Sequence, residues 1–354
     1  MKKLILSMAA LAMIFTSCSE DQNSNLDEQT KVDMSDFFVH TDADQEEAAR
    51  LAANSEAKSC FTMVNLNRQL QENPKLEQNM YAIEYHTRAL TAAKKGGNGN
   101  GNGGGNSGGD GGDGGSGDNL GVISIPVYVH VIYSNTQQNI SDQQIASQIN
   151  VLNDDFRRTN SDANQTPSEF TGVAADTEIE FTLAGTYRYS NSTSSWGTND
   201  AMKSAYPPIT PETHLNIWVC NIGGGILGYA QFPGGNASTD GIVVSPQYFG
   251  TTGYVSAPFD EGRTTTHEVG HYLNLRHIWG DGRCNRDDFV SDTPKSDAPN
   301  YGCPTSAYNC RSNDQFMNYM DYTDDACMNM FSEGQKTRMR SIFQAGGARE
   351  SMVN

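Results

Sequence analysis

Residues 267–277 have the types and spacing of a catalytic metal site. They read HEVGHYLNLRH, with histidines at His267, His271 and His277 and a glutamate at Glu268. His267 and His271 are four residues apart, so on a helix they lie on one face and can bind one metal ion. Three neutral imidazoles leave the fourth position of a tetrahedral zinc ion to water, as in catalytic zinc sites. Glu268 can then reach that water as a general base.

A sharp turn of the chain must bring the third histidine to the first two. His277 lies too far along the sequence to share their face if the helix simply continued. Asparagine is, after glycine, the residue that best tolerates the left-handed conformation that ends helices, and Asn274 stands between His271 and His277. We therefore predict a helix over Thr264–Asn274 that ends in a turn near Asn274.

The surrounding sequence predicts an α/β fold with a mixed sheet. Segments rich in valine, isoleucine and aromatic residues are typical of strands. We expect strands at Ile123–Tyr133, at residues 178–184 and at Leu215–Asn221. The segment Ile226–Gln231 should form the strand at the cleft, where a peptide can add as an extra strand through backbone hydrogen bonds.

Two more helices are predicted from caps and periodicity. Ser141 caps a helix whose apolar residues recur at helical spacing and should form a buried stripe. This stripe consists of Ile145, Ile149, Leu152 and Phe156. Ser332 and Gln335 have the spacing of a capping box, so a last helix should begin there and pack behind the sheet.

The zinc motif resembles HExxHxxGxxH of the metzincin peptidases, with Asn274 at the usual glycine. Within that clan the chain is most similar to the pappalysin family, from about Cys60 to the last helix, through runs such as IPVYVHVIY, TPSEFTGVAADTEIEFTLA and LNIWVCNIGGGILGYAQFPGG. The resemblance implies a metzincin, zincin-like catalytic domain that hydrolyses protein or peptide substrates. It makes NYMDYTDDACMNM the Met-turn, with Met320 beneath the zinc site. Tyr322, two residues on, suits hydrogen bonding to the oxyanion of peptide hydrolysis.

Four of the seven cysteines cluster after the third histidine, at Cys284, Cys303, Cys310 and Cys327. In an exported protein they predict two disulfides, and spacing alone leaves three pairings open. The resemblance to pappalysins implies Cys284 with Cys310 and Cys303 with Cys327, which would staple an irregular C-terminal subdomain. Cys220 lies in an apolar predicted strand and is expected to be a buried free thiol.

The first eighteen residues predict export. Two lysines, an apolar run from Leu4 to Phe15, and a small residue before Cys18 form a secretory signal that is too short to span a membrane as a helix. It resembles a bacterial lipoprotein signal, which implies that Cys18 is lipidated and becomes the mature N-terminus. A plain cleaved signal peptide is the alternative. We expect an outer-membrane lipoprotein, at the cell surface, or a secreted protein.

Residues 19–95 resemble the pappalysin pro-segment, whose cysteine binds the zinc and keeps the enzyme latent. Cys60 is the candidate, because a thiolate is a strong zinc ligand and displaces the water that hydrolysis needs. An incidental free thiol is the alternative for Cys60. The glycine-rich run over 96–118 predicts a flexible linker to a catalytic domain at 119–354. Arg88, Lys94 and Lys95 are candidate activation sites.

Two groups of carboxylates suggest a specificity and a second metal. Asp325 lies where some pappalysins hold a carboxylate in the pocket beyond the scissile bond, which implies cleavage before arginine or lysine. The alternative is that Asp325 only solvates a loop with Asp324. Asp288 and Asp292, with Asp287, offer the oxygen ligands that calcium prefers, in a region where related enzymes bind calcium.

The composition limits the function classes. The formal net charge of −18 at pH 7 argues against a nucleic-acid partner, whose phosphates would be repelled, and favours solubility outside the cell. We expect a monomer. The competing class is a surface binding module on a decayed peptidase scaffold. The presence of Glu268 argues against this class, because an inactive descendant does not need a general base. A peptidase of another metzincin family is the alternative among enzymes.

Overall fold

The computed structural model describes residues 32–43, 60–96 and 118–353. The predicted signal with Cys18, and residues 97–117 of the predicted linker, lie outside the described residues. The domain boundaries at these segments therefore stay predictions. Among the described residues, no helix is both long and apolar enough to cross a membrane.

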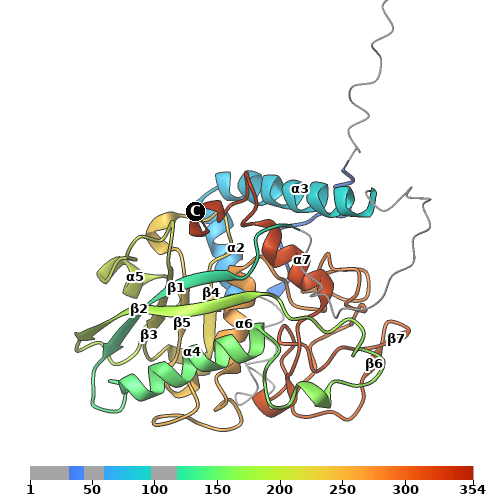
Figure 1. The fold of residues 1–354 in the computed structure, drawn as a ribbon. Helices are drawn as coiled ribbons and strands as arrows, with labels where there is room; N and C mark the ends of the chain where they lie inside the picture. Colours follow the sequence, from blue (N-terminus) through green and yellow to red (C-terminus); the bar gives the residue numbers. More distant parts are fainter. Residues whose placement is uncertain (1–31, 44–59, 97–117, 354) are drawn as a thin grey trace, which may run out of the picture. The chain divides into compact units, whose positions relative to one another are not determined.

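A five-stranded mixed sheet forms the centre of the fold, in the order β2-β1-β3-β5-β4 (Figure 1). β1 (Ile123–Tyr133) pairs in parallel with β2 (Ile179–Ser190) and with β3 (Leu215–Val219). β3 also pairs in parallel with β5 (Ile242–Val244), and β4 (Gly228–Ala230) runs antiparallel to β5 at the edge of the sheet. The predicted mixed α/β fold is therefore confirmed.

The strand predictions differ from the structure mainly in length. β1 has the predicted bounds, and β3 ends at Val219, two residues before the predicted end. β2 continues six residues beyond the predicted end at 184, because its pairing with β1 continues to Ser190. Its second half has no buried apolar residues to indicate a strand, since residues 184–190 are half-buried or exposed. The predicted cleft strand is the edge strand β4, although only three residues of it pair with β5.

Helix α4 (Asp142–Phe156) packs between β2 and the helix that carries the zinc motif. The Ser141 side chain accepts a hydrogen bond from the Gln144 backbone N–H at 3.1 Å, so the predicted cap is confirmed. The predicted apolar stripe is buried in the core with the inward-facing residues of β1. Its members are Ile145, Ile149, Leu152 and Phe156.

The zinc-motif helix is α6 (Arg263–Tyr272), and all of its residues are buried. It ends two residues before the predicted end, because Asn274 has a φ of 76° and reverses the chain. The Leu275 N–H bonds to the Gly270 carbonyl at 2.9 Å, and the Asn274 N–H bonds to the His271 carbonyl at 2.9 Å. These two bonds are the Schellman arrangement, so the predicted turn at Asn274 is confirmed.

Helix α7 (Glu333–Ser341) begins with the predicted capping box of Ser332 and Gln335. Two arginines on α7 make buried ion pairs with distant parts of the chain. Arg340 bonds to both oxygens of Asp118, at 2.8 and 2.9 Å, and donates to carbonyls at the start of β2. Arg340 thereby fastens the last residue of the predicted linker to α7.

In the part of the chain that the structure describes, two helices precede the catalytic domain. α2 (Thr62–Glu72) lies against β4, and α3 (Lys75–Gly96) lies across α7 (Figure 1). Glu84 of α3 is buried and bonds to Arg338 of α7 at 2.6 Å. Burial alone would raise the pKa of Glu84, but Arg338 and Arg88 outweigh it and lower that pKa. The pro-segment helices are thus docked by polar contacts as well as by an apolar cluster around Met63, Leu66 and Leu70.

The chain between α6 and α7 has little regular structure. It contains β6 (Tyr308–Asn309), β7 (Ser312–Asn313) and the short helix η5 (Asp325–Cys327). Disulfides join Cys284 to Cys310 and Cys303 to Cys327, the pairing that the resemblance implies. We call residues 284–327, which these disulfides bound, the stapled segment. The remaining elements are α5 (Ala201–Ala205), η1 (Ala163–Gln165), η2 (Gly223–Gly225), η3 (Ala237–Thr239), η4 (Pro246–Tyr248) and η6 (Glu350–Met352).

Candidate metal centre and active site

Four side chains from the pro-segment and from the zinc motif meet at one buried point. The Nε2 atom of His271 lies 3.1 Å from Nε2 of His267 and 3.1 Å from Nε2 of His277. Tetrahedral zinc with bonds of 2.0–2.1 Å separates its nitrogen ligands by about 3.3 Å, so these rings fit zinc. Cys60 completes the group, since one ligand atom from each of the four residues lies within 4.8 Å of all the others.

The other nitrogen of each imidazole is held by a fixed acceptor. His267 Nδ1 lies 2.7 Å from the Tyr319 carbonyl, and His271 Nδ1 lies 2.8 Å from the Leu275 carbonyl. His277 Nδ1 lies 2.5 Å from Asp281 Oδ1. Such contacts place the proton on Nδ1 and aim Nε2 at the metal. The turn at Asn274 therefore has two effects, because it returns His277 to the site and supplies the carbonyl that orients His271.

Glu268 lies beside the ligands and contacts the pro-segment. Its Oε2 accepts a hydrogen bond from Thr62 Oγ1 at 2.7 Å and lies 3.5 Å from Cys60 Sγ. Gly228 of β4 permits this position, because a Cβ there would lie 3.0 Å from Glu268 Cγ and 2.9 Å from the Val243 carbonyl. The carboxylate therefore sits between the edge strand β4 and the group formed by Cys60 and the three histidines.

Met320 and Tyr322 both lie next to residues of the zinc motif. Met320 lies under α6, where a Cβ on Gly270 would be only 2.4 Å from Met320 Sδ. Tyr322 packs its ring against His277, with centroids 5.0 Å apart, and its hydroxyl donates to the Cys60 carbonyl at 3.2 Å. The Tyr322 hydroxyl is thus aimed at a carbonyl oxygen that is held next to the metal ligands.

The pro-segment contacts each part of this machinery. Cys60 joins the ligand group, Thr62 bonds to Glu268, and the Cys60 carbonyl takes the Tyr322 hydroxyl. Burial and the neighbouring Glu268 raise the pKa of the Cys60 thiol well above its usual value. A thiolate at this position therefore requires a cation beside it, which agrees with a metal at the centre of the group. Cys220, the other free cysteine of the described residues, is buried elsewhere.

A buried polar network supports the zinc-motif helix from behind, and sequence reasoning missed it. Asp155 of α4 accepts hydrogen bonds from Thr266 Oγ1 at 2.7 Å and from the Tyr319 hydroxyl at 2.8 Å. Burial raises the pKa of Asp155 to about 7, although Arg263, Thr266 and Tyr319 oppose that rise. Since Tyr319 also offers its carbonyl to His267, this network connects α4 to one of the predicted metal ligands.

Asp325 is fully buried at the start of α6, so it does not simply solvate a loop with Asp324. Its Oδ2 accepts hydrogen bonds from the backbone N–H groups of Glu261 at 3.0 Å and Arg263 at 3.2 Å. The carboxylate therefore stabilises the N-terminus of the zinc-motif helix, where a negative charge is favourable.

The three carboxylates considered for calcium are each bonded within the protein. Asp288 is buried and accepts from Thr293 Oγ1 at 2.8 Å, and Asp287 pairs with Lys295. Asp292 Oδ2 accepts from the Gly334 N–H at 2.8 Å, at the start of α7. Burial raises the pKa of Asp288 well above its usual value. Within the described residues these carboxylates do not form a cluster of three metal-binding side chains.

The sequence and the fold are similar to those of secreted peptidases. Residues 209–344 match the peptidase family model described as pregnancy-associated plasma protein-A. An extracellular metalloprotease of Arthroderma otae is 35% identical over 234 residues, which cover 63% of this chain and 78% of that protein. Extracellular metalloprotease 1 of Coccidioides posadasii is 37% identical over 240 residues, covering 63% and 79%. The chain belongs to the pappalysin family of metallopeptidases.

Solved structures agree with this membership. Mature mirolysin of Tannerella forsythia, in complex with a cleaved peptide, has 46% identity and a TM-score of 0.63 and covers 65% of this chain and 95% of that chain. A promirolysin variant from the same organism has 39% identity and a TM-score of 0.69, covering 83% and 97%. This pappalysin is therefore a zinc metalloendopeptidase of metzincin fold with a zymogen form. The alternative of another metzincin family is wrong.

Proposed function

We propose that the chain is an exported zinc endopeptidase in which Glu268 is the general base, Tyr322 stabilises the oxyanion and Cys60 maintains latency. The convergence of Cys60 with the three histidine rings beside Glu268 carries this proposal. Relatives named extracellular metalloproteases support export, and the cleaved peptide bound to mirolysin supports a peptide substrate.

The chain's own residues supply the proton transfers. Bound zinc acidifies water and polarises a peptide carbonyl. Glu268 accepts the water proton on its carboxylate and passes it to the leaving amine, while the Tyr322 hydroxyl donates to the oxygen on which negative charge develops. In the latent form Thr62 and the Cys60 carbonyl bind these two groups. Removal of the pro-segment makes both groups accessible to substrate.

The first test is hydrolysis of a casein-like protein by the activated enzyme, with and without a zinc chelator. Chelator-sensitive cleavage that is lost in Glu268→Ala supports the proposal. Absence of cleavage after complete removal of the pro-segment would favour a non-catalytic binding module instead. The same assay tests calcium, because restoration of a chelated enzyme by zinc alone would exclude a required ion near Asp288 and Asp292.

Latency through Cys60 has a matched control within the chain, since Cys60 and Cys220 are both buried free thiols. We expect a Cys60→Ala precursor to convert to active enzyme faster than the wild type when a trypsin-like peptidase is added. A Cys220→Ala precursor should convert at the wild-type rate. Equal rates for all three proteins would make Cys60 an incidental thiol. Mapping the new N-terminus also tests Arg88, Lys94 and Lys95 as activation sites.

We further propose cleavage before basic residues, supported by the buried carboxylate of Asp325 at the start of α6. A peptide library in which the residue after the scissile bond varies should show preference for arginine and lysine, and Asp325→Asn should weaken it. A library without basic preference would exclude this role. Lipidation at Cys18 is tested separately, because Cys18→Ser should move the protein from the membrane fraction to the soluble fraction.

A further inference from the structure

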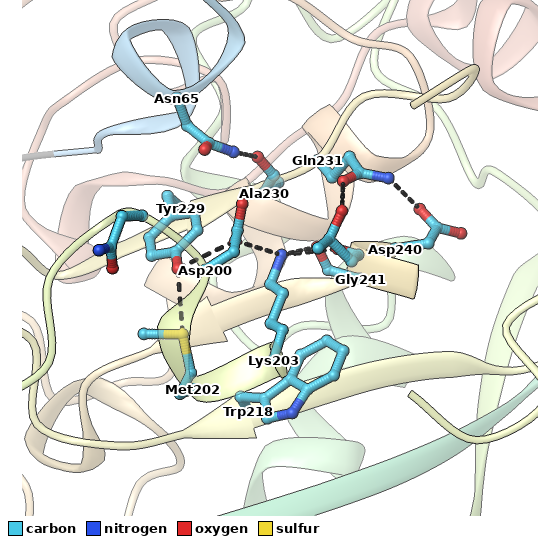
Figure 2. A network of polar contacts seen from close by, with 12 residues as sticks. Asn65, Asp200, Met202, Lys203, Trp218, Tyr229, Ala230, Gln231, Asp240 and Gly241 are labelled. Carbon is cyan, nitrogen blue, oxygen red and sulfur yellow. Dashed lines mark hydrogen bonds and ion pairs between the residues drawn. The ribbon is translucent and has the colours of Figure 1, made fainter. Parts of the chain in front are cut away.

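The pro-segment helix α2 covers the backbone groups of the edge strand β4. The Phe61 N–H bonds to the Gly228 carbonyl at 3.0 Å, and the Ala230 N–H bonds to Thr62 Oγ1 at 2.7 Å. Asn65 Nδ2 donates to the Ala230 carbonyl at 3.1 Å (Figure 2). A peptide that adds to the edge of a sheet uses these same N–H and C=O groups. Helix α2 therefore occupies the place of a substrate strand.

One turn beyond Asn65, the same face of α2 carries Arg68, which pairs with a buried carboxylate of the catalytic domain. Arg68 Nη2 bonds to Asp200 Oδ2, and Asp200 is only 4% exposed. Asp200 directly precedes α5 and is 132 residues away in sequence. The helix that covers β4 thus places a cation on a buried acid that also contacts Tyr229 of β4.

The Asp200 carboxylate is held in place by the catalytic domain itself. Its Oδ1 accepts from the Tyr229 hydroxyl at 3.2 Å and from Lys203 Nζ at 3.1 Å (Figure 2). Lys203 is fully buried, and its Nζ also donates to the Thr239 carbonyl at 2.8 Å. Burial lowers the pKa of Lys203, and Asp200 opposes that shift. Residues of the catalytic domain therefore fix Oδ1, whereas Oδ2 is the oxygen that binds Arg68.

We propose that Asp200 receives a positively charged side chain of the substrate once the pro-segment has left. Departure of α2 exposes Oδ2 to the groove, while Tyr229 and Lys203 keep the carboxylate oriented. A guanidinium or ammonium group from a peptide on β4 then regains the charge-assisted hydrogen bond that Arg68 made. This inference rests on the proposed peptidase function and extends its specificity to a second subsite.

The subsite lies on the opposite side of the scissile bond from the residue assigned to Asp325. β4 runs from Gly228, next to Glu268, to Ala230, next to the Asn65 side chain, and Arg68 follows Asn65 on α2. A peptide that pairs antiparallel with β4 enters from this far end, so its basic residue precedes the scissile bond. The positive charge of Lys203 offsets the attraction of Asp200 for cations at long range. The preference for a basic residue therefore depends on direct contact with the carboxylate, and arginine peptides should be cleaved faster than lysine peptides.

The test compares activated wild type, Asp200→Asn and a control, Asp176→Asn. Asparagine suits position 200, because it tolerates the left-handed φ of 59° there and can still accept the Tyr229 hydrogen bond. Asp176 also pairs with an arginine, Arg157, but at 42% exposure and away from β4, so its variant controls for the lost charge. Substrates are peptides with one fixed residue after the scissile bond and either arginine or citrulline at each preceding position.

At one preceding position we expect wild type and Asp176→Asn to hydrolyse the arginine peptide with a kcat/KM about tenfold above that of the citrulline peptide. In Asp200→Asn the preference for the arginine peptide should disappear, and the citrulline peptide should be cleaved at the wild-type rate. An unchanged ratio in Asp200→Asn would overturn the proposal, as would an equal fall for both peptides, which would mean a structural role. Wild type that cleaves no peptide would contradict the proposed function itself.

A measurement on wild type alone keeps the proposal testable if Asp200→Asn does not fold. The ratio of arginine to citrulline hydrolysis at that position should decrease as salt rises from about 0.05 to 1 M, because an exposed ion pair is screened. A ratio of one at every preceding position would overturn the proposal without any variant.

Discussion

Before His277 the catalytic domain is built from apolar strands and helices, whereas after it the stapled segment depends on disulfides and buried carboxylates. In the first region Ile125, Val127 and Val129 of β1 are fully buried, in one apolar cluster with residues of α4 and α6. In the stapled segment Asp321 is fully buried and bonds to Asn300 through both of its oxygens at 2.8 Å. The stapled segment also sends Tyr319 and Met320 into the main apolar core, so disulfides and hydrogen-bonded carboxylates add to that core rather than replace it.

Each region supplies a different part of the chemistry. The sheet region holds Glu268 and two of the predicted metal ligands, His267 and His271, on one helix, so their relative positions follow from the helix itself. The stapled segment contributes Tyr322, whose position depends on Asp321 and on ring contacts with Trp279 and His277. We therefore expect changes in the two regions to have different consequences, and the following predictions begin with the largest effect.

Glu268→Gln should lower kcat/KM by about 10³- to 10⁴-fold, because the amide cannot accept the water proton. The side chain keeps its shape, so melting temperature and zinc content should stay at wild-type values. Glu261→Gln is the matched control, since Glu261 is half exposed just before α6 and should leave activity unchanged. Retention of more than a tenth of the activity in Glu268→Gln would remove Glu268 from the general-base role.

The free energy of unfolding should fall as pH rises, because each region contains a buried carboxyl group that must lose its proton. Burial raises the pKa of Asp155 and of Asp321 to about 7, above the unfolded value near 4. The folded state therefore binds protons more tightly, and this contribution is complete below about pH 4 and lost as pH rises through 7. The loss amounts to at most roughly 4 kcal/mol per carboxyl.

Denaturant unfolding at pH 5 and pH 8 measures this effect. Asp155→Asn and Asp321→Asn should each unfold with a smaller difference between the two pH values than the wild type. A larger reduction for one variant would show which region carries more of the pH dependence. If both variants keep the full wild-type difference, histidines rather than these carboxyls determine it.

Removal of a disulfide should loosen the stapled segment and spare the sheet. Replacing Cys303 and Cys327 together by serine should lower the free energy of unfolding by roughly 3 kcal/mol, because the disulfide closes a loop of 24 residues. Hydrogen exchange should quicken in residues 284–327 and remain slow in β1 and β3. Equally fast exchange in both regions would mean that the disulfides support the whole domain.

Tyr322→Phe should reduce kcat by about 10²-fold, or about 2.7 kcal/mol, with a smaller change in KM. The hydroxyl acts on charge that develops during the reaction, so its loss should affect the transition state more than substrate binding. Tyr301→Phe serves as control, since Tyr301 lies beside Tyr322 with ring centroids 6.1 Å apart. A pure KM effect in Tyr322→Phe would assign the tyrosine to substrate binding.

Local sequence signals predicted the first region better than the second. The cap at Ser141, the stripe on α4 and the turn at Asn274 follow from spacing and conformational preference, and all three are confirmed. The end of β2 was missed because its pairing with β1, rather than an apolar pattern, continues the strand. Long-range partners leave no local pattern at all.

The residues that orient the metal ligands show this limit. The Tyr319 carbonyl contacts His267 although the two residues are 52 positions apart in sequence. A backbone acceptor cannot be predicted from the type of residue that carries it. Asp281 is a carboxylate four residues after His277, and this spacing is a local signal from which its contact with His277 could have been predicted. Asp155 lies within the helix that the apolar stripe predicts, but its contact with Thr266 depends on how α4 packs on α6.

Helix α7 holds both sides of the predicted linker, through Arg338 to Glu84 and through Arg340 to Asp118. A single cut within residues 97–117 therefore ends covalent attachment without breaking either contact. With the latency proposed for the pro-segment, the severed piece would act as a separate inhibitor, and its effective concentration at the active site would fall to its concentration in solution. The appearance of activity after such a cut should thus follow dilution and dissociation rather than the rate of cleavage.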